Sequence, residues 1–494
     1  MLMRETVSSP GLKRCLGLRE AITITTGTVI GVGLFTVGAN VVGMLGPAVI
    51  FATLIALAIS VYPSLLYAEM SAALPLSGGT YQYASIGLGR VFGVLSGWCF
   101  IISMVSVASG EALAFSFYIR TLLEALGIQL PMDDRWIACL AVAAFLILAV
   151  GGVEMTGRLQ NGFLFFFWGV AIVWIVSMLP SMHFGEAPAI PDPYSLSLSG
   201  FLPCVAMIWW CFAGFETCCS MGEEIRHPNI NLPRALILAP FLVFAVTGLL
   251  QWALLCIVPS GALSSLAEAS APYADGMRLA GITGFPLILL CLGIAFGGDF
   301  STLNASVSAP ARYLYSMARD GVMPAFLGRL HPRFRTPVPA VLILGGLMLL
   351  LIATNSLAII ASLSLFATLL YYVIGMTAAC GLRMRRPGLT RPFRAPLLWI
   401  GAPVSILIYL ALMTQLDRTA VTAGVLWCLL GLLLYALCRR KHRGEDTAAP
   451  DRFNAPVPPT PGEKRRMDRE FRIWCVVVAA AALLVLGLNL ALLL

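Results

Sequence analysis

The chain has few charged residues, and almost none of them is lysine. Charged side chains make up only 11% of its 494 residues, against roughly 25% in ordinary globular proteins. Lysine occurs only at positions 13, 441 and 464. This scarcity of charge, in a chain that is 59% hydrophobic, excludes a water-soluble globular protein.

Residue patterns typical of catalysis or metal binding are also missing. The 13 cysteines form no C-x-x-C pair, and no histidine lies at a ligand spacing from them, so we expect no metal site. The sequence shows no serine–histidine pair, histidine–aspartate cluster or phosphate-binding loop. We therefore expect neither an enzyme nor a cofactor. The net charge of +8 reflects membrane orientation, as described below, and does not indicate nucleic-acid binding.

Apolar runs of about 20 residues are abundant, and each is long enough for a helix to cross a bilayer. Together with a mean hydropathy of +0.88, they predict an all-α polytopic membrane protein with about 12–13 transmembrane helices. The expected spans are residues 20–43, 47–73, 90–124, 136–153, 159–180, 199–221, 235–258, 281–309, 338–354, 357–382, 396–416, 419–438 and 473–494.

The positions of arginine and lysine predict the orientation. With a cytoplasmic N-terminus, the outer side carries only four of the 32 lysine and arginine residues, namely Arg120, Arg135, Arg278 and Arg418. This bias follows the positive-inside rule. We expect a multi-pass protein of the cytoplasmic membrane, with residues 1–19 in the cytoplasm and no cleaved signal peptide. Residues 439–472 are expected to form a basic, proline-rich cytoplasmic linker, either solvated or in contact with anionic lipids.

Glycines and threonines interrupt the first span in the stretch TTGTVIGVGLF, residues 25–35. Glycine weakens a helix by about 1 kcal/mol relative to alanine, and unwound backbone inside a bilayer needs other partners. The sixth span holds a similar stretch, MIWWCFAGFETCC, residues 207–219. We predict breaks near Ile30–Gly33 and near Trp210–Gly214. Two breaks five helices apart are typical of transporters built from inverted five-helix repeats.

Several longer motifs resemble the amino acid–polyamine–organocation (APC) superfamily of transporters. They are TGTVIGVGLF (26–35), LSGGTYQYASIGLGRVFGVLSGW (76–98), FAGFETCCSMGEEIRHPNINLPRAL (212–236), ARYLYSMARDGVMPAFLGRLHPRFRTPVPAVL (311–342) and RPFRAPL (391–397). The resemblance implies a leucine-transporter-type fold of 5+5 helices, with repeat one at about 20–180 and repeat two at about 199–382. Helices eleven and twelve would follow at 396–438. A thirteenth helix at 473–494 departs from the family pattern.

The resemblance also implies a substrate site at the two breaks. The backbone N–H groups of Gly31, Val32 and Gly33 would bind a substrate carboxylate, as the positive end of a half-helix favours an anion. Carbonyl oxygens of Val29, Trp210 and Ala213 would bind its ammonium, with Ile30 and Gly214 inside the breaks. The alternative is that these glycines only allow close helix packing.

An aromatic gate is expected at Trp210, which aligns with a gating aromatic of related exchangers. Such a ring closes over the substrate and attracts a cation. Trp209 and Phe212 are rival candidates. Simple packing against neighbouring helices is the other interpretation.

Carboxyl groups inside membrane spans are costly and usually functional. By alignment with a family exchanger, Ala108 and Glu111 would lie on the side-chain pocket, one helical turn apart. There Glu111 would pair with a cationic substrate or bind a coupling proton. Glu216, after the second break, and Asp299, in the eighth span, are further gate or coupling candidates. For each, a structural hydrogen bond to a neighbouring helix is the alternative.

A lysine that replaces a sodium ion in several proton-coupled relatives is absent, because the matching stretch of the fifth span is GFLFFFWG, residues 162–169. This leaves exchange, proton coupling through a carboxyl group, or a cation held by backbone oxygens. We expect a secondary transporter of an amino acid or related amine that works by alternating access, with a leaning to cationic substrates. A neutral amino acid permease and a transporter-like nutrient sensor are the alternatives. The oligomeric state is not predicted.

Overall fold

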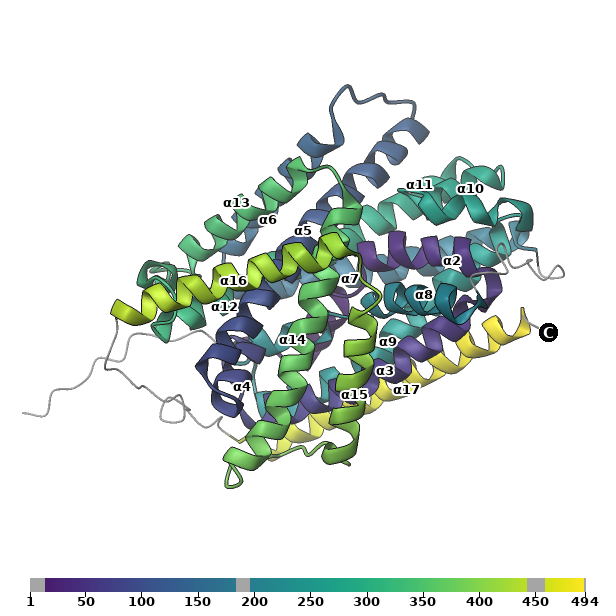
Figure 1. Cartoon of the computed structure of the whole chain (residues 1–494). Coiled ribbons are helices and arrows are strands. Elements are labelled where there is room, and N and C mark those ends of the chain that lie inside the picture. The colour runs from purple at the N-terminus through teal and green to yellow at the C-terminus, as the bar shows by residue number, and fades with distance from the viewer. Residues whose placement is uncertain (1–13, 184–195, 442–457, 493–494) are drawn as a thin grey trace, which may run out of the picture.

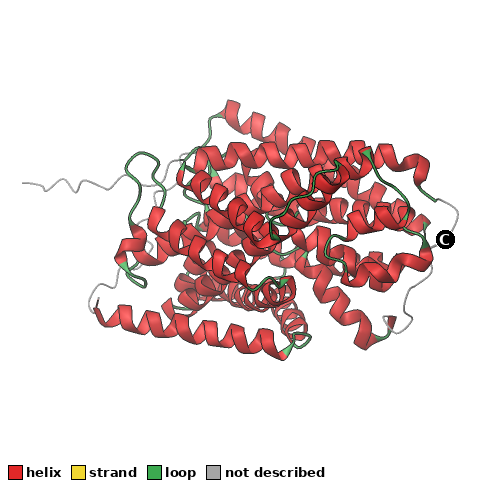
Figure 2. Ribbon diagram, turned by 90° about the horizontal axis from the view of Figure 1, so that it is seen from above, coloured by secondary structure: helices red, strands yellow, loops and turns green. Residues whose placement is uncertain are grey.

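The structure is a computed structural model that describes residues 14–183, 196–441 and 458–492. In these residues the regular elements are helices joined by turns and loops (Figure 2). Nine helical segments among them are long and apolar enough to cross a membrane, and Val338–Ala353 and Leu398–Met413 are shorter apolar helices. The prediction of an all-α polytopic membrane protein is confirmed.

Helices occur in all thirteen of the expected spans. The first half contains α1 (Leu18–Gly27), η1 (Gly33–Gly38), α2 (Ala39–Leu45), α3 (Val49–Ala73), α4 (Gly79–Gly87), α5 (Arg90–Ala125), α6 (Asp134–Val150) and α7 (Val153–Met178). The second half contains α8 (Leu198–Trp210), η5 (Phe215–Ser220), α9 (Pro228–Ile257), η6 (Ser260–Glu268), α10 (Pro272–Leu279), α11 (Phe285–Gly293), η7 (Ile294–Asp299), α12 (Phe300–Arg319), α13 (Val338–Ala353) and α14 (Leu357–Arg385). The last three are α15 (Leu398–Met413), α16 (Arg418–Lys441) and α17 (Pro461–Ala491).

The helix α5 runs through the middle of the bundle (Figure 1). It packs against α14, α12, α6 and α13, and most of its side chains between Gly93 and Leu122 are buried. Small residues such as Ala108 and Ser109 let neighbouring helices approach closely, as is usual where lipid supplies no hydrophobic drive. The central position of α5 brings Glu111 to the interior.

The thirteenth helix, α17, begins at Pro461 rather than at residue 473. Thr460 caps it: the Glu463 N–H donates to the Thr460 hydroxyl at 3.3 Å, and the Thr460 N–H donates to the Glu463 carboxylate at 2.8 Å. This reciprocal capping box starts a helix, so residues 461–472 of the expected linker are helical. Residues 442–457 lie outside the described residues.

Specific contacts hold α17 along α9, and the two run side by side (Figure 1). Arg234 of α9 pairs with Asp468 and lies over the ring of Phe471, 4.9 Å from its centroid. Near the other end, the Asn489 amide donates to the Gly248 carbonyl at 3.0 Å. The helix is therefore docked by polar contacts at both of its ends.

Candidate functional site

The first membrane span is broken, as predicted. Helix α1 ends at Gly27, residues 28–31 form turns and bends, and the π-helix η1 starts at Gly33. The hydroxyl of Thr302, on α12, lies 2.7 Å from the Gly27 carbonyl and 3.0 Å from the Ile30 carbonyl. It therefore supplies a partner for backbone that unwinding has released.

The sixth span is also broken, between Trp210 at the end of α8 and Phe215 at the start of η5. Gly214 has φ +105°, a left-handed conformation that favours glycine. Its N–H donates to the Tyr372 hydroxyl at 3.1 Å. The two breaks touch, because a Cβ added to Gly214 would lie 3.3 Å from Cγ2 of Thr28.

A small cavity lies where the breaks meet. It measures about 20 Å³, which is room for about one water molecule. The space at the site is therefore very small. Its lining residues are Thr28, Val29, Val32, Gly33, Ser103, Met104, Val107, Glu111, Trp210, Ala213, Gly214, Thr368 and Tyr371.

Trp210 separates this cavity from a much larger vestibule. The vestibule measures about 430 Å³, and Trp210 and Val32 line both spaces. Its far side is formed by residues 268–270, which belong to the loop region that the arginine pattern places outside the cell. The rival Trp209 is buried and donates to the Tyr409 hydroxyl at 3.0 Å. Neither Trp209 nor Phe212 lines the cavity or the vestibule.

Glu111 lines the cavity, and one of its carboxylate oxygens is already used within the protein. Its Oε1 accepts the Val32 N–H at 2.8 Å, so one backbone donor expected for a substrate carboxylate is already occupied. Gly31 makes this approach possible. A Cβ on Gly31 would lie 2.2 Å from Oε1 of Glu111 and 2.4 Å from Oγ1 of Thr302.

Two of the three carbonyls expected to bind an ammonium also have partners. The Val29 carbonyl accepts the Gly31 N–H, and the Trp210 carbonyl accepts the Ala213 N–H, each at 3.1 Å. Each oxygen keeps a second lone pair for a ligand. The expected residues Val29, Val32, Gly33, Trp210, Ala213 and Gly214 thus come together around one cavity.

Other expected site residues lie behind the cavity wall. Ile30, Gly31 and Ala108 are buried and do not line it. Glu216 is fully buried and accepts hydrogen bonds from the hydroxyls of Tyr371 and Tyr372. It is connected to the cavity through Tyr371, which lines it, and through Tyr372, which binds the Gly214 N–H. Asp299 is fully buried at the end of η7 and interacts with Glu111.

Sequence reasoning missed part of the cavity lining. Met104 and Val107 precede Glu111 by seven and four residues on α5, so helical periodicity would place them on its face. The hydroxyls of Ser103 and Thr368 lie 2.6 Å apart and join α5 to α14. No local signal indicates that pairing, because the two residues are far apart in the sequence.

Two ion pairs connect the segment before α9 to α12, and Glu224 of one pair also lines a hollow of about 480 Å³. Glu224 pairs with Arg312 at 3.1 Å, and both side chains are buried. Burial raises the pKa of Glu224, and the Arg312 guanidinium opposes that shift. Glu223 pairs with Arg319, also at 3.1 Å. Both arginines belong to α12.

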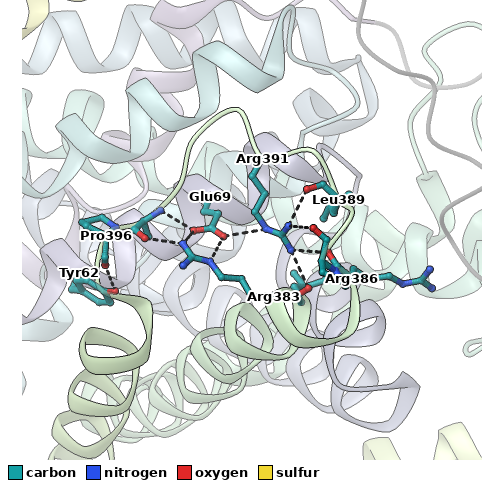
Figure 3. A network of polar contacts seen from close by, with 10 residues as sticks. Tyr62, Glu69, Arg383, Arg386, Leu389, Arg391 and Pro396 are labelled. Atoms are coloured by element: carbon teal, nitrogen blue, oxygen red, sulfur yellow. Dashed lines mark hydrogen bonds and ion pairs between the residues drawn. The ribbon is translucent and has the colours of Figure 1, made fainter.

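Glu69 holds two helices and a loop together (Figure 3). Its carboxylate accepts Nε of Arg383 at 2.9 Å and lies 3.3 Å from Nε of Arg391. The Ala395 N–H donates to it at 2.7 Å. These contacts join α3, α14 and residues 386–397, so we assign Glu69 a structural role.

No group of three or more histidine, cysteine, aspartate or glutamate side chains that could hold a metal ion occurs in the described ranges. The residues that line the cavity include four with hydroxyl groups, one with a carboxylate, and residues from the backbone of both breaks. Such groups can bind a zwitterion, but they form no catalytic constellation.

Comparison with known proteins points to one family. The profile described as amino acid permease matches residues 16–437. An uncharacterized transporter of Mycobacterium tuberculosis is 28% identical over 456 residues, covering 90% of this chain and 96% of the relative. A branched-chain amino acid permease of Bacillus subtilis is 24% identical, covering 89% and 96%. Cationic amino acid transporter 4 of Mus musculus is 27% identical, covering 78% and 62%.

Proposed function

Because the chain belongs to the amino acid permease family, we propose that it carries an amino acid across the cell membrane by alternating access. The protein is a membrane transporter and not an enzyme. The observation that carries the mechanism is Trp210, which lines both a small cavity at two helix breaks and a wide vestibule. By changing its orientation, a ring in that position opens or closes the cavity toward the vestibule.

Contacts of Glu224 support the same proposal. Its carboxylate pairs with Arg312, and the Cys15 N–H donates to the Glu224 carbonyl at 2.9 Å. These contacts tie the start of the first span to α12. We propose the orientation expected from the arginines, with the N-terminus in the cytoplasm, so the vestibule faces outward and these contacts form the inner closure.

The substrate we propose is an amino acid with a small, uncharged side chain. Met104, Val107 and Thr368 supply an uncharged wall, and the cavity is small. Oε1 of Glu111, the expected anchor for a cationic side chain, is used by the Val32 N–H. The branched-chain permease of Bacillus subtilis is a relative with a neutral substrate.

A cationic amino acid is the second candidate. Glu111 lines the cavity, and its Oε2 has no hydrogen-bond partner in the described structure. An ammonium reaching that oxygen would gain a charge-assisted bond. The mouse relative named cationic amino acid transporter 4 supports this alternative.

Counterflow in proteoliposomes tests the proposal. The purified chain is reconstituted and loaded with L-alanine, L-leucine, L-lysine or L-arginine, and uptake of the same radiolabelled amino acid is measured. We expect exchange of L-alanine or L-leucine. Exchange of L-lysine and L-arginine alone would favour the second candidate. Binding of amino acids without exchange of any of them would indicate a sensor and contradict the proposal.

A further inference from the structure

Glu111 and Asp299 form a carboxyl pair that is buried beside the first helix break. Their exposed fractions are 1% and 0%, and the two carboxyl groups interact directly across the contact of α5 with η7. Oε2 of Glu111 and both oxygens of Asp299 accept no hydrogen bond within the described residues. Three buried oxygens without donors are costly, so the pair requires a ligand.

Among the residues that the structure describes, no positively charged side chain acts on the pair. The titratable and polar groups that face it are the Val32 N–H, the Thr302 hydroxyl of α12 and the Tyr118 phenol of α5. The Thr302 hydroxyl is used by two carbonyls, and the Tyr118 hydroxyl donates to the Phe35 carbonyl at 3.1 Å. Only Val32 therefore donates a hydrogen bond to the pair.

A proton fits this site better than a metal ion. Hard cations take about six or more oxygen ligands, whereas two carboxyl groups and no vacant carbonyl cage are present here. Two carboxylates that face each other without a cation cannot both be ionised at low cost. They share a proton instead, as in other carboxyl pairs.

We propose that Glu111 and Asp299 together bind the proton that drives transport, and that the Val32 N–H links this proton to the substrate. This inference rests on the proposed amino acid transport. With the cavity empty, the Val32 N–H stabilises an ionised Glu111, and Asp299 holds the proton. When a substrate carboxylate takes the Val32 N–H, Glu111 loses its only donor. It then takes a proton from the vestibule and returns it to water on the other side.

Two variants separate the roles of the pair. Glu111→Gln keeps a carbonyl oxygen for Val32 and removes the titrating group. Asp299→Asn replaces a like charge with an amide that can donate to Glu111, which stabilises the ionised form of Glu111. We therefore expect Glu111→Gln to abolish proton coupling. Asp299→Asn should shift the coupling to more acidic pH.

The first test needs no substrate. Infrared spectra of the full chain in liposomes are recorded across a pH titration, and the carbonyl stretch of protonated carboxyl groups is followed. We expect a titrating band that is lost in Glu111→Gln and altered in Asp299→Asn. The matched control is Asp133→Asn, because the partnership with Arg135 lowers the pKa of Asp133 to about 2. Identical spectra in the parent and Glu111→Gln would overturn the inference.

The second test uses labelled L-alanine and L-lysine in proteoliposomes with an acidic exterior. Glu111→Gln should lose accumulation driven by the pH gradient, measured against its own counterflow in the same vesicles, whereas the control Asp133→Asn should keep both. Accumulation by Glu111→Gln equal to the parent, or accumulation that needs sodium, would contradict the proton pair. Absence of counterflow in the parent would instead contradict the proposed function. In that case the infrared titration alone tests whether Glu111 and Asp299 bind a proton.

Discussion

The thiol of Cys211 donates to the carbonyl oxygen of Gly33 at 2.9 Å, so the second helix break is bonded directly to the first. A Cβ added to Gly33 would lie 3.6 Å from Cα of Cys211, an ordinary contact distance. The two unwound segments thus form one unit, although nearly 180 residues separate them. A substrate bound to either segment can therefore affect the other.

The glycines of the first break should differ in their tolerance of a side chain. We expect Gly31→Ala to abolish amino acid binding, because its Cβ would displace Glu111 and Thr302. Gly33→Ala is the matched control and should retain binding, since its Cβ meets no atom closer than 3.6 Å. Thermal-shift titration with the transported amino acid measures both. Equal affinities for the two variants would show that Gly31 is not needed for the position of Glu111.

A bulkier side chain at Gly33 should have a different effect. Gly33→Leu would fill space beside the Trp210 ring, which is 3.7 Å from the added Cβ. We expect binding and transport to be lost while membrane insertion and expression stay normal. Counterflow at matched expression is the measurement, and full counterflow by Gly33→Leu would count against the site.

Removal of the indole ring of Trp210 should lower the affinity for the amino acid more than it lowers thermal stability. Trp210→Ala joins the cavity to the vestibule, so we expect about tenfold weaker amino acid binding, or roughly 1.4 kcal/mol. The neighbour Trp209 provides the control, because its indole N–H binds Tyr409 away from the cavity. Trp209→Phe should lower thermal stability and leave affinity nearly unchanged. Weaker amino acid binding by Trp209→Phe, with unchanged binding by Trp210→Ala, would indicate that Trp209 is the gate.

The buried pair at the inner closure should control access to the cavity from that side. Glu224→Gln leaves the Arg312 guanidinium buried without its counter-charge, a change that typically costs about 3–5 kcal/mol. The Ser308 carbonyl accepts a hydrogen bond from Arg312. We expect a cysteine introduced at Ser308 to react faster with a water-soluble maleimide in Glu224→Gln than in the parent. Glu223→Gln removes the ion pair with Arg319, which is partly exposed. It should therefore increase the labelling rate less than Glu224→Gln does. No difference in labelling rate between the two would argue against this role.

The docking of α17 depends on the absence of a side chain at Gly248. A Cβ there would lie 2.5 Å from Cγ1 of Val485, so Gly248→Val should destabilise the protein by about 1–3 kcal/mol, as overpacking does. Gly487→Ala is the control, since a Cβ at that position meets nothing within 4 Å. The melting temperature in detergent should fall only for Gly248→Val. If it does not, α17 contributes little to stability.

Much of the fold could be predicted because each span has a local signal. Length and hydropathy predict a membrane helix, since a polar backbone must bond within its own segment in lipid. Glycine and threonine at residues 25–33 predict the first break for the same reason. The sequence predicts the start of α17 at residue 473, twelve residues after its actual start at Pro461, because residues 461–472 are rich in charge. The Thr460–Glu463 capping box can nevertheless start a helix that is polar.

The sequence by itself determined an all-α membrane protein with breaks in its first and sixth spans, since apolar runs and glycines act locally. Only the tertiary structure decided where the carboxyl groups point. Glu111 lines the cavity as expected, but its bond to the Val32 N–H and its contact with Asp299 could not be predicted from the sequence. Glu224 meets Arg312 of α12 rather than a neighbour in sequence. A buried charge takes its partner from whichever helix packs beside it, and packing among helices is not encoded in any single segment.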